Sequence, residues 1–133
     1  MLTQLYIKDF ALIDELEVQF DRGLSIITGQ TGAGKSIIIG AFNMVLGERA
    51  DTDVIRNKGG KAIAEATLKI QKTATLERLF TENELEWHEY LVLRREIKET
   101  GSRAFVNDSP VPIHVLKSIG DQLVDLHGQH DHQ

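Results

Sequence analysis

The sequence predicts a mixed α/β fold. Residues 24–28, Leu-Ser-Ile-Ile-Thr, are a short β-branched run typical of a buried strand. A glycine-rich stretch follows, and residues 37–46 then form an apolar segment that reads as a helix ending at Gly47. Further segments alternate apolar and polar residues, so we expect a sheet of mixed and antiparallel strands rather than a regular doubly wound one.

The first twenty residues predict an antiparallel hairpin. Residues 2–8 and 16–20 alternate apolar and polar side chains, which favours two half-buried strands. Residues 9–14 are the short connection between them. Residues 21–23, Asp-Arg-Gly, are then a turn leading into the strand at 24–28.

The second half predicts further strands and two short helices. Residues 48–60 are polar and poorly periodic, which indicates a loop with a helical turn near Asp53. Strands are predicted at 62–70, 90–97, 103–106 and 122–127, and helices at 75–83 and 113–119. A tight turn is expected at Asn107-Asp108, and Gly120 is expected to stop the last helix.

The glycine-rich stretch fits the phosphate-binding pattern G-x-x-x-x-G-K-[ST] at every fixed position. Its residues are Gly29, Gln30, Thr31, Gly32, Ala33, Gly34, Lys35 and Ser36. The glycines let successive N–H groups turn inward around phosphate oxygens, and the helix that follows adds its unpaired N–H groups and positive dipole end. Lys35 should reach the β- and γ-phosphates, and Ser36 should ligate Mg²⁺.

Composition favours a soluble globular domain. The chain has 133 residues, 41% of them apolar and 26% charged, and no cysteine, which excludes disulfides and thiol metal sites. The charged start argues against a signal peptide, and no apolar run approaches the length of a membrane span. A net charge of −5 argues against a large nucleic-acid surface, and the mixed charges of residues 94–99 favour a solvated strand or hairpin edge.

The last seven residues are rich in histidine and allow three interpretations. His127, His130 and His132 with Asp131 have side chains that bind zinc, although their spacing is too close for a rigid closed site. The segment is equally compatible with a polar loop. In the third interpretation, a glutamine directly after the strand at 122–127 helps to hold Mg²⁺ and the attacking water beside the phosphate loop.

Several segments together resemble one protein family. They are residues 5–13, the loop at 28–36, Leu-Gly-Glu-Arg-Ala at 46–50, Phe-Val-Asn-Asp at 105–108 and Leu-His-Gly-Gln-His at 126–130. This set resembles the N-terminal head segment of the RecN family of bacterial DNA repair proteins, which is similar to the SMC proteins. That family has an ABC-type ATPase head split by a long coiled coil, and the match spans nearly the whole chain.

The resemblance implies roles for individual residues. Residues 29–36 would be the Walker A loop for ATP, with Lys35 catalytic. Gln129 would be the Q-loop glutamine, catalytic and bound to Mg²⁺ together with Ser36, and Gln133 is the alternative. In related heads, the positions of Lys8, Asp9 and Phe10 approach the base and ribose, and an arginine corresponding to Arg49 or Arg56 lies near the phosphates.

Other family features are missing from these residues. No Walker B strand is found, since Leu123-Val124-Asp125 lacks the following acid, and there is no Leu-Ser-Gly-Gly signature or coiled-coil heptad. Residues 1–133 are therefore expected to be the N-terminal part of a split head. Its expected partners are the C-terminal half of that head, a second head on ATP binding and DNA through the full-length protein, in the bacterial cytoplasm at the nucleoid and without membrane contact.

Two alternatives from other classes remain open. The chain is also compatible with a complete small P-loop enzyme, such as a kinase of a small metabolite. It is equally compatible with a nucleotide-binding module that never hydrolyses its ligand. Turnover after mixing with a C-terminal half would separate this module from the ATPase head.

We predict that the chain alone hydrolyses ATP little or not at all. The full-length protein is the expected ATPase, and the missing metal carboxylate and signature loop each contribute roughly 10² or more in rate. The measurement is steady-state phosphate release, with Lys35→Ala as the contamination control. A turnover of about one per second that vanishes in Lys35→Ala would favour the complete small enzyme.

Overall fold

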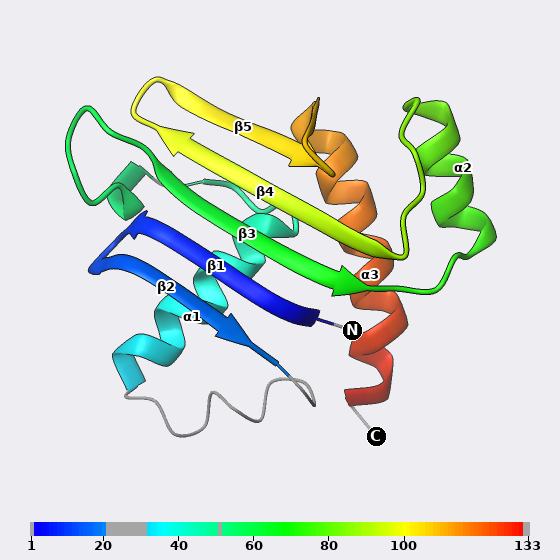
Figure 1. The fold of residues 1–133 in the computed structure, drawn as a ribbon, viewed down its shortest axis with the longest axis horizontal. Helices are drawn as coiled ribbons and strands as arrows, with labels where there is room; N and C mark the ends of the chain where they lie inside the picture. Colours follow the sequence, from blue (N-terminus) through cyan, green and yellow to red (C-terminus); the bar gives the residue numbers. More distant parts are fainter. Residues whose placement is uncertain (1, 21–31, 51, 132–133) are drawn as a thin grey trace.

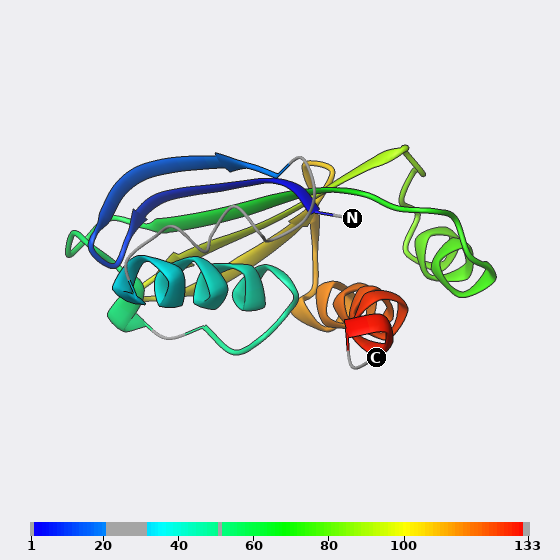
Figure 2. The same cartoon turned by 90° about the horizontal axis from the view of Figure 1, so that it is seen from below.

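The computed structural model describes residues 2–20, 32–50 and 52–131, with only the backbone at residues 32–34 and 124–131. The predicted turn at 21–23, the predicted strand at 24–28 and the loop residues Gly29, Gln30 and Thr31 lie outside this part. The described chain folds into an antiparallel sheet with helices α1 and α3 on one face (Figures 1 and 2).

The sheet has the strand order β2-β1-β3-β4-β5-β6 and every neighbouring pair is antiparallel. The strands are β1 (Leu2–Phe10), β2 (Ile13–Gln19), β3 (Ala62–Lys69), β4 (Tyr90–Lys98), β5 (Gly101–Val106) and β6 (Ser109–Val111). The predicted hairpin at the start and the strands near 62–70, 90–97 and 103–106 are confirmed. The short strand β6 was not predicted, because Pro110 lies within it, Pro112 follows it and three residues are too few to show alternation.

Helix α1 (Gly32–Val45) lies across β3 and β4 (Figure 2). Alternate residues of β3 point at it, and Ala62, Ala64 and Ala66 are all fully buried. Because alanine projects only a methyl group, the helix backbone can approach the sheet closely. Ile38, Ala41 and Val45 of α1 fill this interface and belong to the core.

The end of α1 agrees with the sequence prediction. Gly47 has φ of +101°, the left-handed conformation that glycine adopts at little cost. The N–H of Gly47 donates to the carbonyl of Met44 at 3.1 Å, and that of Glu48 donates to Asn43 at 3.2 Å. These bonds satisfy carbonyls at the end of the helix, as in a glycine C-cap. The predicted helical turn near Asp53 is the short 3₁₀ helix η2 (Thr52–Val54).

The tight turn at Asn107-Asp108 is also confirmed. Both residues are left-handed, with φ of 49° and 69°, as the favoured two-residue hairpin turn requires. The side-chain oxygen of Asn107 accepts a hydrogen bond from the backbone N–H of Val92 at 2.9 Å, and the N–H of Asn107 donates to the Val92 carbonyl at 2.8 Å. The turn is thereby fastened to the neighbouring strand β4.

The end of the described chain corrects two predictions. Helix α3 runs from Ile113 to Asp131, so Gly120 does not stop it and the predicted strand at 122–127 is wrong. Gly120 is buried where α3 passes the end of α1, and an added Cβ would lie 2.2 Å from the carbonyl oxygen of Leu46. The glycine therefore serves a close helix contact, which local sequence does not reveal. The shorter helix α2 (Ala74–Glu82) contacts α3, and the Thr73 hydroxyl caps its first turn.

The arginine pair on β4 corrects another prediction. β4 is an inner strand between β3 and β5, so residues 94–97 are not a solvated sheet edge, whereas Lys98 and Glu99 are exposed at the end of the β4–β5 hairpin. Arg95 points at the helices and is 1% exposed, whereas Arg94 points to the outer face. There Arg94 pairs with Glu65, Glu96 and Asp108 at 3.4, 3.3 and 3.1 Å.

The outer face also carries a hydrogen bond between β1 and β2. The Tyr6 hydroxyl donates to the Glu15 carboxylate at 2.6 Å. This bond, with a smaller effect of burial and nearby negative charge, raises the pKa of Tyr6 to about 12. Tyr6 is therefore neutral and able to donate across the physiological pH range.

We predict that Gly120→Ala destabilises the fold, although alanine is the better helix former. The added methyl group would overlap the Leu46 carbonyl, and such overpacking costs about 1–3 kcal/mol. Gly40→Ala is the matched control, because Gly40 has nothing within 4 Å of an added Cβ and should gain about 1 kcal/mol. Thermal unfolding would measure both, and a Gly120→Ala chain as stable as the parent would refute the close contact.

Candidate nucleotide site

The predicted phosphate loop leads directly into α1. Gly32, Ala33 and Gly34 begin this helix, and Lys35 and Ser36 follow in its first turn and a half. Both Lys35 and Ser36 are exposed. The first N–H groups of a helix have no partner within it and lie at the positive end of its dipole. The described half of the loop thus presents a lysine and a hydroxyl at a helix N-terminus, a combination that suits phosphate and a phosphate-bound Mg²⁺.

The β1–β2 turn lies at the same end of the molecule as the start of α1 (Figures 1 and 2). Asp9 and Ala11 of this turn have φ of 49° and 54°. Left-handed backbone at residues other than glycine costs about 1–3 kcal/mol and persists only where the surroundings enforce it. The turn is therefore held in a strained and specific shape at the end of the molecule where α1 starts.

The segment after η2 enforces that shape. The N–H of Ala11 donates to the carbonyl of Val54, and Phe10 and Ile55 form an antiparallel bridge. Arg56 contributes two bonds, from its N–H to the Asp9 carbonyl at 3.2 Å and from its guanidinium to the Leu12 carbonyl at 2.7 Å. Arg56 is thereby fixed at the β1–β2 turn.

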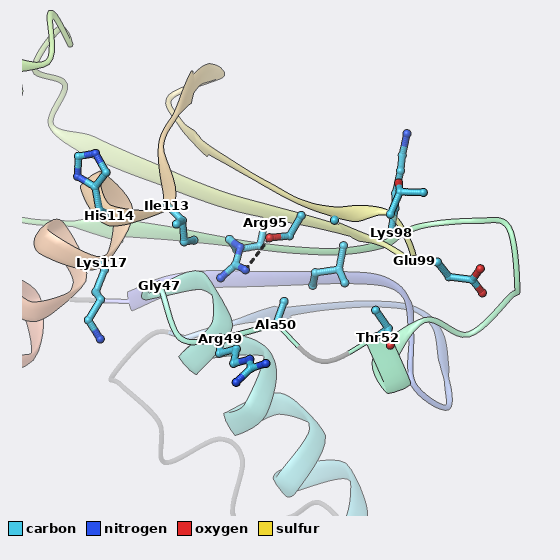
Figure 3. A pocket seen from close by; sticks show the side chains of 14 residues that line it. Gly47, Arg49, Ala50, Thr52, Arg95, Lys98, Glu99, Ile113, His114 and Lys117 are labelled. Atoms are coloured by element: carbon cyan, nitrogen blue, oxygen red, sulfur yellow. Dashed lines mark hydrogen bonds between the residues drawn. The ribbon is translucent and has the colours of Figure 1, made fainter.

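The two candidate arginines occupy different places. Arg49 lies just beyond the C-terminal end of α1, where it lines a cavity of about 640 Å³ (Figure 3). The other walls come from β4, β5 and the first turn of α3. Arg56 lies instead with the β1–β2 turn, at the end where α1 starts (Figures 1 and 2). The geometry favours Arg56 over Arg49 as the arginine on the phosphate side.

The three residues expected near the base and ribose divide into two kinds. Phe10 is 2% exposed and belongs to the core, so its ring supports the turn. Lys8 is exposed and Asp9 half-buried.

Leu12, at the tip of the turn, is 81% exposed, and the sequence analysis did not single it out. The available signal was its place in the predicted connection at residues 9–14, because connecting segments run over the protein surface.

Gln129 lies in the last turns of α3, and its side chain, like that of Gln133, is outside the described part. Gln129 therefore does not follow a strand, contrary to the context expected for it. Within residues 2–20, 35–50 and 52–123, whose side chains the structure describes, no group of three His, Asp or Glu side chains could hold a metal. His127, His130 and His132 fall beyond these residues.

The fold and the loop at the start of α1 define the class of protein. The family model described as the AAA domain matches residues 4–129, so the chain belongs to the AAA-domain family, a class of nucleotide-binding domains. Solved SMC heads share its fold. One SMC ATPase structure superposes with a TM-score of 0.68 at 21% identity, covering 89% of this chain and 76% of that one. An Smc head bound to the C-winged helix domain of ScpA gives 0.63 at 18% identity, covering 89% and 39%.

Within this class, the chain is similar along its whole length to the DNA repair protein RecN. It is 40% identical over 134 residues to RecN of Vibrio cholerae and 42% identical over 135 residues to RecN of Bacillus subtilis. Each alignment covers all of this chain and 24% or 23% of the relative. The predicted resemblance and the predicted fold class are confirmed, and the chain spans about a quarter of the length of these relatives.

Among the helices in the described ranges, none is both long and apolar enough to cross a bilayer.

We predict that Arg56→Ala weakens ATP binding while Arg49→Ala does not. Removing the guanidinium bond to Leu12 loosens the strained turn and takes a positive charge from the phosphate side. A loss of roughly five- to tenfold in affinity is expected for Arg56→Ala, the value of about one hydrogen bond. Calorimetric titration of both variants is the measurement, and a larger loss in Arg49→Ala would reverse the assignment.

Proposed function

We propose that this chain is the ATP-binding N-terminal part of a RecN-like ATPase head that acts in the repair of broken DNA. The observation that carries the proposal is the start of α1. There, the predicted phosphate loop meets a helix N-terminus that exposes Lys35 and Ser36, on a sheet with the fold of an SMC head. The relatives at 40% and 42% identity are DNA repair proteins, which supports the biological role.

In this proposal the residues of α1 bind and orient the triphosphate. The N–H groups of the loop and first turn hold phosphate oxygens, and Lys35 places its charge at the β- and γ-phosphates. The Ser36 hydroxyl would provide one ligand for Mg²⁺, an ion that would supply positive charge at the phosphates. Gln129 is proposed as the second protein ligand and as the group that orients the attacking water, with Gln133 as the alternative.

The proposed partners follow from what α1 leaves exposed. Ile38 of α1 is buried against the sheet, whereas Ile39 is 43% exposed. We propose that the C-terminal half of the head covers this side, and that residues 1–133 are one part of a split domain. A solved SMC ATPase with the same fold is described as dimerising when driven by ATP and as activated by DNA. That supports a second head and DNA as partners of the full-length protein. We also propose a location in the bacterial cytoplasm at the nucleoid, because the relatives are bacterial DNA repair proteins.

We predict that Lys35→Ala abolishes ATP binding without unfolding the chain. Lys35 is exposed, so its loss removes charge at the phosphates and little packing. At least a tenfold loss of affinity is expected, since hydrogen bonds to charged groups contribute roughly 1.5–3 kcal/mol. Calorimetric titration with ATP and Mg²⁺ measures the affinity, and circular dichroism checks the fold.

The matched control is Lys72→Ala. Lys72 is an exposed lysine just before α2, and its loss should leave ATP affinity unchanged within about twofold. Equal affinity in Lys35→Ala and the parent chain would refute a phosphate role for the loop.

A further inference from the structure

The guanidinium of Arg95 joins three elements of the fold. From β4, it donates through Nη1 to the carbonyls of Met44 and Glu48 at 2.7 and 2.8 Å, and through Nη2 to the Ser102 hydroxyl at 3.1 Å (Figure 3). Met44 and Glu48 lie at the C-terminal end of α1 and just beyond it. Arg95 therefore fastens the end of α1 to the middle of the sheet.

Burying the charged guanidinium of Arg95 costs free energy of folding. Arg95 is 1% exposed, its Nε is buried without a partner, and none of the ion pairs within the described ranges involves it. Burial lowers the pKa of Arg95 below its ordinary value, yet an arginine stays charged. Replacing such a buried charge by an apolar side chain of similar volume is often neutral for stability. Stability alone therefore does not explain why a buried arginine occupies position 95.

The sheet is built to admit this side chain. The residues paired with Arg95 across the two neighbouring strands are Ala64 on β3 and Ala104 on β5, both buried. Their short side chains leave room for the guanidinium between the sheet and α1. The carbonyls at the helix end supply partial negative charge in place of a carboxylate.

Helix α3 fixes the same end of α1 from another side. A Cβ on Gly47 would lie 2.5 Å from the Cα of Lys117, and one on Gly120 would lie 2.2 Å from the carbonyl oxygen of Leu46. Backbones in such close contact cannot slide past one another without a clash. The C-terminal end of α1 is thus held by Arg95 from the sheet and by α3 beside it.

We propose that Arg95 is a positioning residue for the phosphate loop. An α-helix rises 1.5 Å per residue, so Met44 is about 14 Å along α1 from Lys35. Because both residues belong to one continuous helix, a displacement at Met44 also displaces Lys35. By fixing the carbonyl end, Arg95 sets where the opposite end places Lys35 and Ser36. This inference rests on the proposed nucleotide function, because the positioned groups are those that hold the phosphates.

The test is Arg95→Met, which keeps much of the volume and removes the forked hydrogen bonds. The expected result is a folded chain whose ATP affinity falls roughly tenfold, since small displacements far from the reacting groups have effects of this order or larger. Amide hydrogen exchange at residues 35–39, measured without nucleotide, should become faster. Arg95→Lys should restore part of the ATP affinity, because an ammonium can reach one of the two carbonyls.

The control is Arg94→Met, at the neighbouring position on the opposite face of β4. Arg94 pairs with Glu65, Glu96 and Asp108. Its replacement should leave ATP affinity within about twofold and exchange at residues 35–39 unchanged. If Arg95→Met bound ATP as Arg94→Met does, with unchanged exchange, the positioning role would be wrong. Should Arg95→Met not fold, a folded Arg95→Lys with parental affinity and exchange would overturn the proposal equally.

The two proposals fail in different ways. If the parent chain and Lys35→Ala bind ATP equally, the nucleotide function is wrong. In that case, amide exchange without nucleotide still decides whether Arg95 fixes the start of α1. If Lys35→Ala loses binding and Arg95→Met does not, the nucleotide function stands and the positioning role is wrong.

Discussion

The close approach of α1 to the sheet is the constraint on which the rest of the structure depends. Three fully buried alanines on β3 make it possible, because larger side chains would hold the helix away from the strands. The same closeness brings the last carbonyls of α1 within reach of Arg95 on the next strand. It also determines where α3 can pack against the end of α1. At this contact only glycine fits at positions 47 and 120. A change in the distance between α1 and the sheet would therefore also change the contact of Arg95 with the helix end and the contact of α3 with α1.

Much of the fold could be predicted because its information is local. β3 and β4 alternate buried and less buried residues along most of their length, and the turn at Asn107-Asp108 uses residues that tolerate left-handed backbone. The failures arose where distant residues decide the outcome. Gly120 has the composition of a helix stop, but its contact is with Leu46, more than seventy residues earlier in the chain. Arg95 belongs to a charged run, and only the strands on either side of β4 make it an inner residue.

The candidate site also has a part that the sequence predicts and a part that only the structure reveals. The phosphate loop could be recognised because all its residues are consecutive, so one short pattern contains the chemistry. The choice between Arg49 and Arg56 could not be made from the sequence, because the two lie close together in the chain and only the folded structure brings one of them to the β1–β2 turn. The exposure of Leu12 was missed as well, because its apolar neighbours Ala11 and Ile13 outweighed its place in the predicted connection at residues 9–14. Sequence patterns therefore identified the groups that bind phosphate better than the groups that surround it.

The two outermost strands determine how another protein can join this sheet. β2 carries exposed Asp14, Glu15 and Glu17, and β6 is three residues long with a proline at its centre. Charges on a sheet edge and a missing N–H donor both discourage pairing with a further strand. Among the described strands, growth of the sheet by edge-to-edge addition is therefore disfavoured at β2 and at β6. A protein that packs on this sheet would then contact its faces, where shape and side chains rather than backbone pairing determine the fit.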